Sequence, residues 1–470
     1  MVRLLNKLLS KAFFPISLKY ISLIVYILLI IIGFWADSSD SKFLNQLRNT
    51  NLGNLIIWSY WWPLIVVVAI FFGRFWCMVC PVEIITTLFS KIGLRRKRPG
   101  WLKSGWAITI FYVLILFVGI HGVAIHRNPT FMSAYLLAIV GVSIIVGGIY
   151  EKNTFCQYVC PVGYLLGIYS KLSFFGWRVA DKLVCETCKD KSCIHNKYLY
   201  NLNNKSCGVD LYPANIESNS DCILCAGCMK TCDKYQSEEN VRRPNPQITK
   251  IGFANDLFRL QTLKTAEFVF VLIVSGFVIY EIWAEWSTSK GILLFVPKSI
   301  IEYFSISNSI LAGLIKSSII FIILPLIIWL IPFLISNLIG STIKLKEYFL
   351  AYGISFIPIM AAAHISKAIL KTTSRIPYFE HVFDDVSGIS TAQKIIDKEI
   401  ILSPNPIILN IIVSILITIT IMIGIVISAK VVKKLNEKYN YGKQSFSYYL
   451  IPIIYGSIFL IMVLIWRWTP

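Results

Sequence analysis

The sequence predicts an all-α polytopic membrane protein that carries one polar, cysteine-rich insert. Hydrophobic residues make up 56% of its 470 residues, and only 15% are charged. Apolar runs long enough to cross a bilayer as helices recur along the chain, which also argues against a membrane β-barrel. All twelve cysteines fall between Cys77 and Cys232, and most of them lie in the polar insert.

We expect about nine transmembrane helices, because each apolar run exceeds the roughly 18 residues that a helix needs to cross a bilayer. No small-residue cleavage site follows the first run before the loop at Asp37–Asp40, so we interpret it as a span and not as a cleaved signal peptide. The predicted spans are about 20–36, 53–73, 104–124, 131–149, 266–284, 308–337, 348–366, 405–428 and 447–466.

The net charge of +20 is distributed as in a membrane protein. With the N-terminus inside, most Lys and Arg residues fall on the inner side, and the densest cluster is Arg95–Arg98. This pattern predicts a multi-pass protein of a prokaryotic inner (cytoplasmic) membrane, with its N-terminus and cysteines in the cytoplasm. The basic loops are expected to meet membrane lipid headgroups. Without a soluble basic and aromatic module, we expect no nucleic-acid partner.

Three regions follow along the chain. Residues 1–164 form a four-span unit with two inner Cys-Pro loops, residues 165–264 form the cytoplasmic insert, and residues 265–470 form a five-span region of unknown role. The reducing cytoplasm disfavours disulfides and favours metal thiolates. The insert has few periodic apolar faces, so bound metal clusters would supply the cohesion that its core lacks.

The densest cysteine group is a ferredoxin-type run. Its spacing, Cys222-x2-Cys225-x2-Cys228-x3-Cys232, is typical of a loop that wraps a [4Fe–4S] cube. A zinc ribbon also uses four cysteines, but its paired-knuckle spacing differs from this x2-x2-x3 pattern. Asp233 follows the run where bacterial ferredoxins usually have proline.

The second cysteine group completes a two-cluster, ferredoxin-like insert. It reads Cys185-x2-Cys188-x4-Cys193, with Cys207 further on. The last cysteine of a ferredoxin run usually ligates the other cluster, which predicts crossed ligation. Cluster 1 would be bound by Cys185, Cys188, Cys193 and Cys232, and cluster 2 by Cys222, Cys225, Cys228 and Cys207.

The remaining cysteines form two Cys-Pro loops, Cys77-x2-Cys80-Pro81 and Cys156-x3-Cys160-Pro161. Both loops follow spans that end on the same face, so the four thiols are candidates for a third cluster, another metal site or a redox-active thiol set. The alternative is that these cysteines pack as small apolar residues at helix ends, with each proline starting the next helix.

The segments "GRFWCMVCP" and "FCQYVCPVGYLLG", followed by the two ferredoxin-type groups, resemble membrane polyferredoxins of the NapH and NosR type. The resemblance covers about residues 50–240, although the first loop is one residue shorter than the family's Cys-x3-Cys-Pro pattern. It implies an electron-transfer subunit between the quinone pool and a partner redox protein, either a periplasmic reductase or a cytoplasmic donor.

Three ionisable residues near the outer ends of predicted spans are candidates for a quinol or b-type haem site. They are His121, His364 and Glu281. Intramembrane ionisable groups are functional candidates by default, and histidines from two helices can bind haem or hydrogen-bond a quinol. Interfacial histidines bonded to water or backbone are the simpler interpretation.

The sequence therefore indicates a membrane-bound iron–sulfur electron-transfer component of an oxidoreductase system. It contains no readable catalytic metal centre, so we do not expect a stand-alone enzyme. An assembly or maturation factor for a partner metalloenzyme and a b-haem or quinol oxidoreductase subunit remain alternatives.

Overall fold

The structure is a computed structural model that describes residues 2–36, 40–201, 205–232, 235–238, 241–439 and 442–468. The chain forms two compact units. The cysteine unit consists of Met1–Ile30, Val68–Ile108 and Leu136–Asp256, and the C-terminal unit consists of Ile31–Val67, Thr109–Tyr135 and Leu257–Pro470. Each unit therefore draws on more than one of the three regions predicted along the chain.

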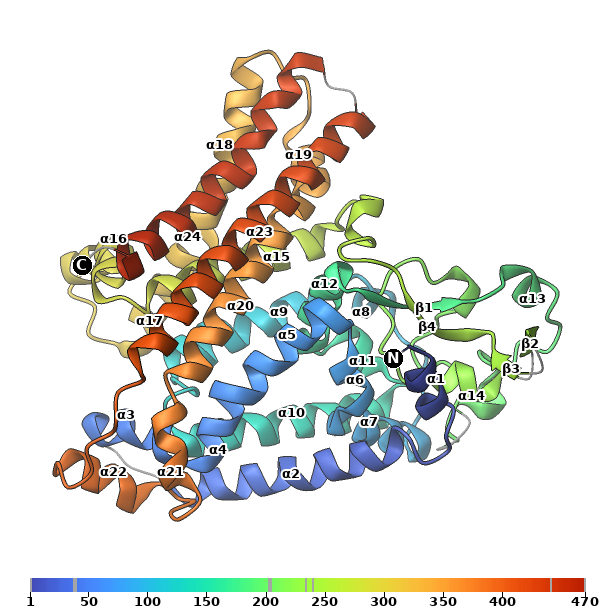
Figure 1. The fold of residues 1–470 in the computed structure, drawn as a ribbon, viewed down its shortest axis with the longest axis horizontal. Coiled ribbons are helices and arrows are strands. Elements are labelled where there is room, and N and C mark those ends of the chain that lie inside the picture. The colour runs from blue at the N-terminus through green and yellow to red at the C-terminus, as the bar shows by residue number, and fades with distance from the viewer. Residues whose placement is uncertain are drawn as a thin grey trace. The chain divides into compact units, whose positions relative to one another are not determined.

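Up to residue 256 the fold is mainly helical, with four short strands (Figure 1). Two further segments, Ile56–Trp61 and Ile115–Gly122, are π-helical. The helices are α1 Val2–Leu9, α2 Ile16–Phe34, α3 Ser41–Thr50, α4 Leu52–Leu55, α5 Trp62–Phe72, α6 Phe75–Val79, α7 Pro81–Ile92, α8 Gly100–Lys103, α9 Trp106–Leu114, α10 Pro129–Ile149, α11 Thr154–Tyr158, α12 Pro161–Tyr169, α13 Lys182–Glu186 and α14 Gly227–Thr231. The strands are β1 Phe175–Val179, β2 Tyr235–Glu238, β3 Val241–Pro244 and β4 Pro246–Lys250.

The rest of the chain is helical in the described residues. The helices are α15 Thr265–Trp283, α16 Ser287–Tyr303, α17 Ser309–Ser318, α18 Leu324–Leu338, α19 Leu345–Tyr352, α20 Ile357–Thr373, α21 Phe379–Val382, α22 Ile389–Ile396, α23 Ile407–Tyr439 and α24 Leu450–Trp468. A π-helical segment, Ile319–Ile323, joins α17 to α18.

Eight helical stretches in the described residues are long and apolar enough to span a membrane. A shorter apolar helix, Trp106–Gly122, occupies the place of the third predicted span. Every predicted span thus corresponds to an apolar helix, and the prediction of an all-α polytopic membrane protein is confirmed.

Two helices extend well past their predicted spans. The span predicted over 405–428 is the first part of α23, which continues to Tyr439. The span predicted over 348–366 belongs to a helical stretch that runs from Leu345 to Val382. Both extensions contain lysines. Hydropathy ends a predicted span at such charged residues, but lysine has a high helix propensity, so the helix itself continues.

In the cysteine unit, the insert is built on short elements. Strands β1 and β4 pair antiparallel, from Phe175 opposite Lys250 to Val179 opposite Pro246. A separate antiparallel pair joins β2 and β3. An apolar core that includes Leu9, Met78, Trp177, Leu224, Met229 and Ile248 packs around Cys222. Two of the five helices and strands that supply these core residues, α1 and α6, lie outside the predicted insert.

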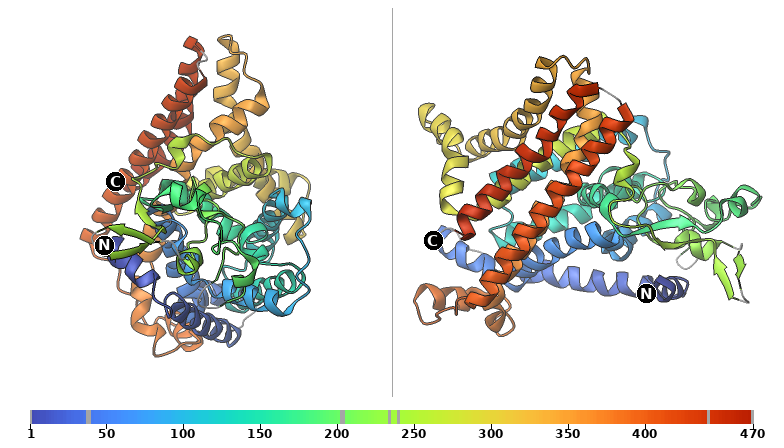
Figure 2. Two further views of the ribbon diagram at one scale, coloured as in Figure 1. Left: turned by 90° about the vertical axis from the view of Figure 1, so that its right-hand side faces the viewer. Right: turned by 45° about the horizontal axis from the view of Figure 1, so that its top comes forward.

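In the C-terminal unit, α23 packs against both α20 and α24. Figure 1 and both views of Figure 2 show α23 and α24, the last two helices of the chain, side by side. Glycines permit the close approaches. A Cβ atom at Gly276 of α15 would lie 2.5 Å from the Ile320 carbonyl oxygen. Aromatic rings fill the interior, and Trp329 stacks on Phe356 with 3.8 Å between ring centroids.

Candidate iron–sulfur sites

One predicted cluster set lines a cavity in the cysteine unit. Its walls include Cys207, Cys222, Cys225 and Cys228. The other lining residues are Trp177, Val209, Leu211, Ile216, Ile223 and Ala226. We call these four cysteines the middle set. They belong to segments on both sides of the 3-10 turn Pro213–Asn215, and the fold brings them to one cavity.

The backbone of the middle set is shaped for an anion. Leu224 has φ +54° and Ala226 has φ +58°, so left-handed residues alternate with the cysteines of the run. Non-glycine residues seldom adopt this conformation. Alternating backbone handedness turns successive N–H groups toward one side, forming the concavity that many iron–sulfur sites use.

Hydrogen-bond donors reach the sulfur atoms of the middle set. The Trp177 indole N–H donates to Cys228 Sγ at 3.2 Å, and the Leu211 backbone N–H donates to Cys207 Sγ at 3.3 Å. Burial raises the pKa of Cys222 and Cys228, and the neighbouring thiolates raise it further. Positive iron would remove this repulsion, so the donor set fits a thiolate-bound cluster.

The other predicted cluster set also comes together. Cys193 interacts electrostatically with Cys232, Cys185 and Cys188. Its pKa is raised to about 12, mainly by burial and secondly by these neighbouring thiolates. We call these four cysteines the outer set. Asn245 is buried, and its side-chain amide donates to Cys185 Sγ at 3.1 Å. Cys232 caps the C-terminal end of α14, which positions it toward a set that lies earlier in the sequence.

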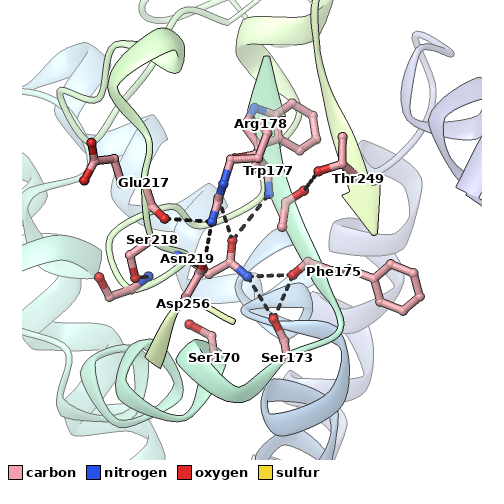
Figure 3. A network of polar contacts seen from close by, with 12 residues as sticks. Ser170, Ser173, Phe175, Trp177, Arg178, Glu217, Ser218, Asn219, Thr249 and Asp256 are labelled. Carbon is pink, nitrogen blue, oxygen red and sulfur yellow. Dashed lines mark hydrogen bonds and ion pairs between the residues drawn. The ribbon is translucent and has the colours of Figure 1, made fainter. Parts of the chain in front are cut away.

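A polar network braces the chain just before Cys222 (Figure 3). The Asn219 side chain donates to the Phe175 carbonyl at 2.6 Å and accepts from the Trp177 backbone N–H at 3.3 Å. Arg178 donates to Asp256 at 2.6 Å, and Asp256 accepts from the Asn219 backbone N–H at 3.0 Å. This network ties β1, which carries Trp177, to the segment that enters the cysteine run.

In both Cys-Pro loops the second cysteine precedes a helix that begins with proline. Cys80 precedes α7 and Cys160 precedes α12, each as the N-terminal cap with proline in the first turn. The Gly163 backbone N–H donates to Cys160 Sγ at 3.3 Å. The prolines therefore start helices, as the alternative interpretation expected, and they also present the cysteines at helix N-termini, where thiolate charge is stabilised.

The four Cys-Pro thiols interact with one another. Cys156 interacts with Cys160, Cys80 and Cys77, and burial followed by neighbouring negative charge raises its pKa well above the usual value. Burial also raises the pKa of Cys160 to about 11, although the Gly163 N–H opposes the shift. We call these four cysteines the Cys-Pro set. Its members come from two separate loops, and the spacing of the cysteines alone could not show that these loops come together.

Arg74 is buried against the Cys-Pro set, and only 4% of it is exposed. A Cβ atom built on Gly163 would lie 2.9 Å from Arg74 Nη2 and 3.6 Å from Cys160 Sγ, so the guanidinium and this thiol flank Gly163. Burial alone lowers the pKa of Arg74, but the Cys77 thiolate, Asp221 and Cys160 outweigh burial and raise it. Arg74 is therefore permanently charged.

A second buried network lies beside the same loops. Glu83, which is 2% exposed, accepts hydrogen bonds from Lys19, from Lys205 at 2.7 Å and from the Asn153 side-chain amide at 2.7 Å. Burial alone raises the pKa of Glu83, but the two ammonium groups overcome it and hold this pKa far below 4.5. Lys19 also interacts with Cys156 and Cys225, so it is close to both the Cys-Pro set and the middle set.

In the described residues, no three Cys, His, Asp or Glu side chains converge closely enough to hold one metal ion. A cube is different, because each of its four thiolates binds a different iron and the ligands stand further apart. The observed sets, with their buried thiols and N–H donors, therefore fit [4Fe–4S] clusters better than a mononuclear zinc site.

In the C-terminal unit the structure gathers the three membrane candidates. Glu281 interacts electrostatically with both His121 and His364. Glu281 also pairs with Lys367 at 3.1 Å. The His121 ring packs edge-on against Tyr280, 4.8 Å between centroids, and its Nε2 is buried without a hydrogen-bond partner in the described residues.

Several residues that contact the cysteines were not predicted. Trp177 and Asn245 lie outside the cysteine runs, and no local pattern marks them. Arg74 stands three residues before Cys77 in the segment "GRFWC", where an arginine next to a cysteine motif was a usable signal. Glu83 lies in the first turn of α7, two residues after Pro81. Acidic residues are common there because they interact favourably with the helix dipole, so nothing in the sequence singled it out.

A family model described as a 4Fe-4S binding domain matches residues 55–101 and 132–179. These segments contain the Cys-Pro set, and they end before the cysteines of the outer and middle sets. The chain is also 26% identical over 176 residues to an uncharacterised protein of Methanocaldococcus jannaschii. That alignment covers 36% of this chain and 65% of the relative, just under two thirds of its length. No solved structure matches the chain.

The family match and the apolar helices together identify a membrane iron–sulfur protein. The matched segments contain both Cys-Pro loops. They were the least regular cysteines in the sequence, and they are the ones that fall within the matched 4Fe-4S segments.

Proposed function

We propose that this protein is an electron-transfer subunit that binds three [4Fe–4S] clusters, one in each cysteine set. The observation that carries the proposal is the gathering of twelve cysteines into three sets of four mutually interacting thiols. A bound [4Fe–4S] cluster takes up and releases single electrons. The chain's own part is to hold the thiols, exclude water from them and donate hydrogen bonds to sulfur.

The three sets are linked in series. Cys228 of the middle set interacts with Cys193 of the outer set. Lys19 interacts with Cys225 of the middle set and with Cys156 of the Cys-Pro set. The middle set therefore lies between the other two, an arrangement that suits a relay between the membrane end of the cysteine unit and its polar insert.

We propose that the membrane redox partner is quinol as reductant or quinone as oxidant. Its proposed site consists of His121, His364 and Glu281. Glu281 interacts with both histidines, and the buried His121 Nε2 can accept a hydrogen bond from a quinol hydroxyl. A carboxylate and an imidazole can also take the protons that quinol oxidation releases. A b-type haem between the histidines is the alternative occupant.

The soluble partner in the proposal is a redox protein, either a periplasmic reductase or a cytoplasmic donor. The resemblance to NapH- and NosR-type polyferredoxins supports this class of partner. The polar insert with the outer set is the part of the chain that we propose to exchange electrons with it.

Iron and sulfide analysis, combined with low-temperature EPR of the purified protein, tests the cluster count. We expect about twelve irons per chain, because each [4Fe–4S] cluster holds four. Cys160→Ser should remove one EPR signal and leave about eight irons, and Cys225→Ser should remove a different signal. About eight irons in the unaltered protein, with no change in Cys160→Ser, would contradict a third cluster.

The same preparation tests the quinol site. A quinol analogue should reduce the clusters, and Glu281→Gln should slow this reduction at least tenfold without changing the iron content. Glu285→Gln is the matched control, because Glu285 also pairs with Lys367. Equal slowing in both variants would argue against a specific role of Glu281, and a Soret band in the optical spectrum would favour the haem alternative.

A further inference from the structure

Arg74 lies between the Cys-Pro set and the middle set. It precedes α6, and its side chain extends to the segment that enters the cysteine run. Its Nη1 donates to the Ser220 carbonyl oxygen at 2.8 Å, two residues before Cys222. Its charge interacts with Cys77 and Cys160 on one side and with Cys222 on the other.

The charge of Arg74 has no close carboxylate to neutralise it. Among the described residues, no ion pair joins this guanidinium to Asp or Glu, and Asp221 interacts with it only at longer range. Lys19 and Lys205 differ, because both share Glu83. A buried charge is stable only when other groups compensate for lost hydration. For Arg74 the compensating groups are the Ser220 carbonyl oxygen, the Cys77 thiolate, and then Asp221 and Cys160.

We propose that Arg74 is a positioning residue shared by two redox sites: it fastens the cysteine run to the Cys-Pro loops and raises the reduction potential of the centres on both sides. This inference rests on the proposed function, because it assumes that the Cys-Pro set and the middle set each bind a cluster.

The direction of the effect follows from charge. Reduction adds one negative charge to a cluster, and a nearby positive charge in a buried site stabilises the added electron. The reduced state therefore gains more than the oxidised state, and the potential rises. In the described residues, the cysteines that interact with Arg74 belong to the Cys-Pro and middle sets, so the centre of the outer set serves as an internal reference within the same molecule.

Three variants separate charge from structure. Arg74→Gln removes the charge and most of the hydrogen bonds. Arg74→Lys keeps the charge but replaces the planar guanidinium and its several N–H donors with a single ammonium group. Arg96→Gln is the matched control, because it removes the same charge from an exposed residue of the cysteine unit, where water and salt screen it. Each variant is purified as the full-length chain, its iron is counted, and its EPR signals are titrated against potential.

In Arg74→Gln we expect the signals of the Cys-Pro and middle sets to move to more negative potential, while the outer set stays in place. The expected shift is at least a tenfold change in the ratio of reduced to oxidised cluster, which is about 59 mV for one electron. Arg74→Lys should recover most of this shift, and Arg96→Gln should show none. Arg74→Gln could instead lose iron. If the iron is lost from these two sets and Arg74→Lys retains it, the result supports the positioning role.

The inference is overturned if Arg74→Gln keeps its iron and its potentials, or if all three centres shift or are lost together. Failure of the proposed function gives a different result, namely about eight irons in the unaltered protein. The effect of Arg74 would then be measured at the middle set alone, where its bond to Ser220 and its interaction with Cys222 still predict a shift.

Discussion

At the scale of single residues, the cysteine sets are distinguished by what touches their sulfur atoms. Trp177 donates to Cys228 and Asn245 donates to Cys185, whereas Cys160 accepts from a backbone N–H of its own helix. Hydrogen bonds to sulfur stabilise the more negative, reduced form of a cluster and are one of the main controls on its potential. The three sets should therefore have distinct potentials.

Trp177→Phe should lower the potential of the middle set. The change removes the indole N–H that bonds to Cys228 Sγ while it keeps an aromatic ring in the core. A lost hydrogen bond of about 1 kcal/mol corresponds to a shift of about 40 mV for a one-electron couple. An EPR redox titration measures the shift. Trp101→Phe, at an exposed tryptophan, should leave the potential unchanged, and an equal shift in both variants would refute the role of the hydrogen bond.

Cysteine spacing suggests the outer and middle sets, because a cube needs its ligands at short, fixed intervals and the crossed ligand is a general property of two-cluster folds. The contacts of Trp177 and Arg74 could not be predicted in this way. Arg74 meets Ser220 and Gly163, which are remote in sequence, and only the packing of α6, α12 and the cysteine run brings these residues together.

At the scale of helices, close backbone contact organises the C-terminal unit. Gly276 of α15 faces the π-helical segment Ile319–Ile323, and a Cβ atom there would lie 2.6 Å from the Phe321 Cα atom. Both near atoms belong to the backbone and have little freedom to move. Membrane helices commonly pack through such small residues, because lipid provides no hydrophobic force to hold helices together.

Gly276→Ala should destabilise the C-terminal unit by about 1–3 kcal/mol, the usual penalty of overpacking a tight contact. The control is Gly291→Ala in α16, where a Cβ atom would meet nothing within 4 Å. There the better helix propensity of alanine should stabilise by up to about 1 kcal/mol. Thermal unfolding in detergent compares the two variants. A melting temperature for Gly276→Ala at or above that of Gly291→Ala would contradict the packing argument.

At the scale of the whole molecule, the Cys-Pro set limits the possible topologies. Cys80 and Cys156 interact, so both loops are on the same side of the membrane. The chain between them must therefore cross the bilayer an even number of times. Helix α10 is long enough to cross once, and the short helix Trp106–Gly122 must then supply the second crossing. As a regular α-helix its 17 residues would rise about 26 Å, and the π-helical segment Ile115–Gly122 shortens this, so the helix is just below the thickness of the hydrocarbon core.

If the eight long apolar helices and Trp106–Gly122 all cross the bilayer, the two chain ends lie on opposite sides of the membrane. With the N-terminus in the cytoplasm, as the basic loops indicate, we expect alkaline phosphatase to be active when fused after residue 126 or after the last helix. A fusion within the insert should be inactive, and green fluorescent protein should report the opposite pattern. An active phosphatase in the insert would contradict this topology.

If the outer and middle sets bind clusters by the proposed crossed assignment, the order of their cysteines along the chain has a consequence for how the protein is built. Every ligand of the middle set lies between Cys193 and Cys232, so iron that binds the outer set closes a loop around all of them. Iron that binds the middle set closes a shorter loop, which contains none of the outer ligands. Because a shorter loop loses less chain entropy on closure, maturation is favoured from the inside outward. A delivery system that supplies finished clusters would have to fill the enclosed site before it seals the enclosing one.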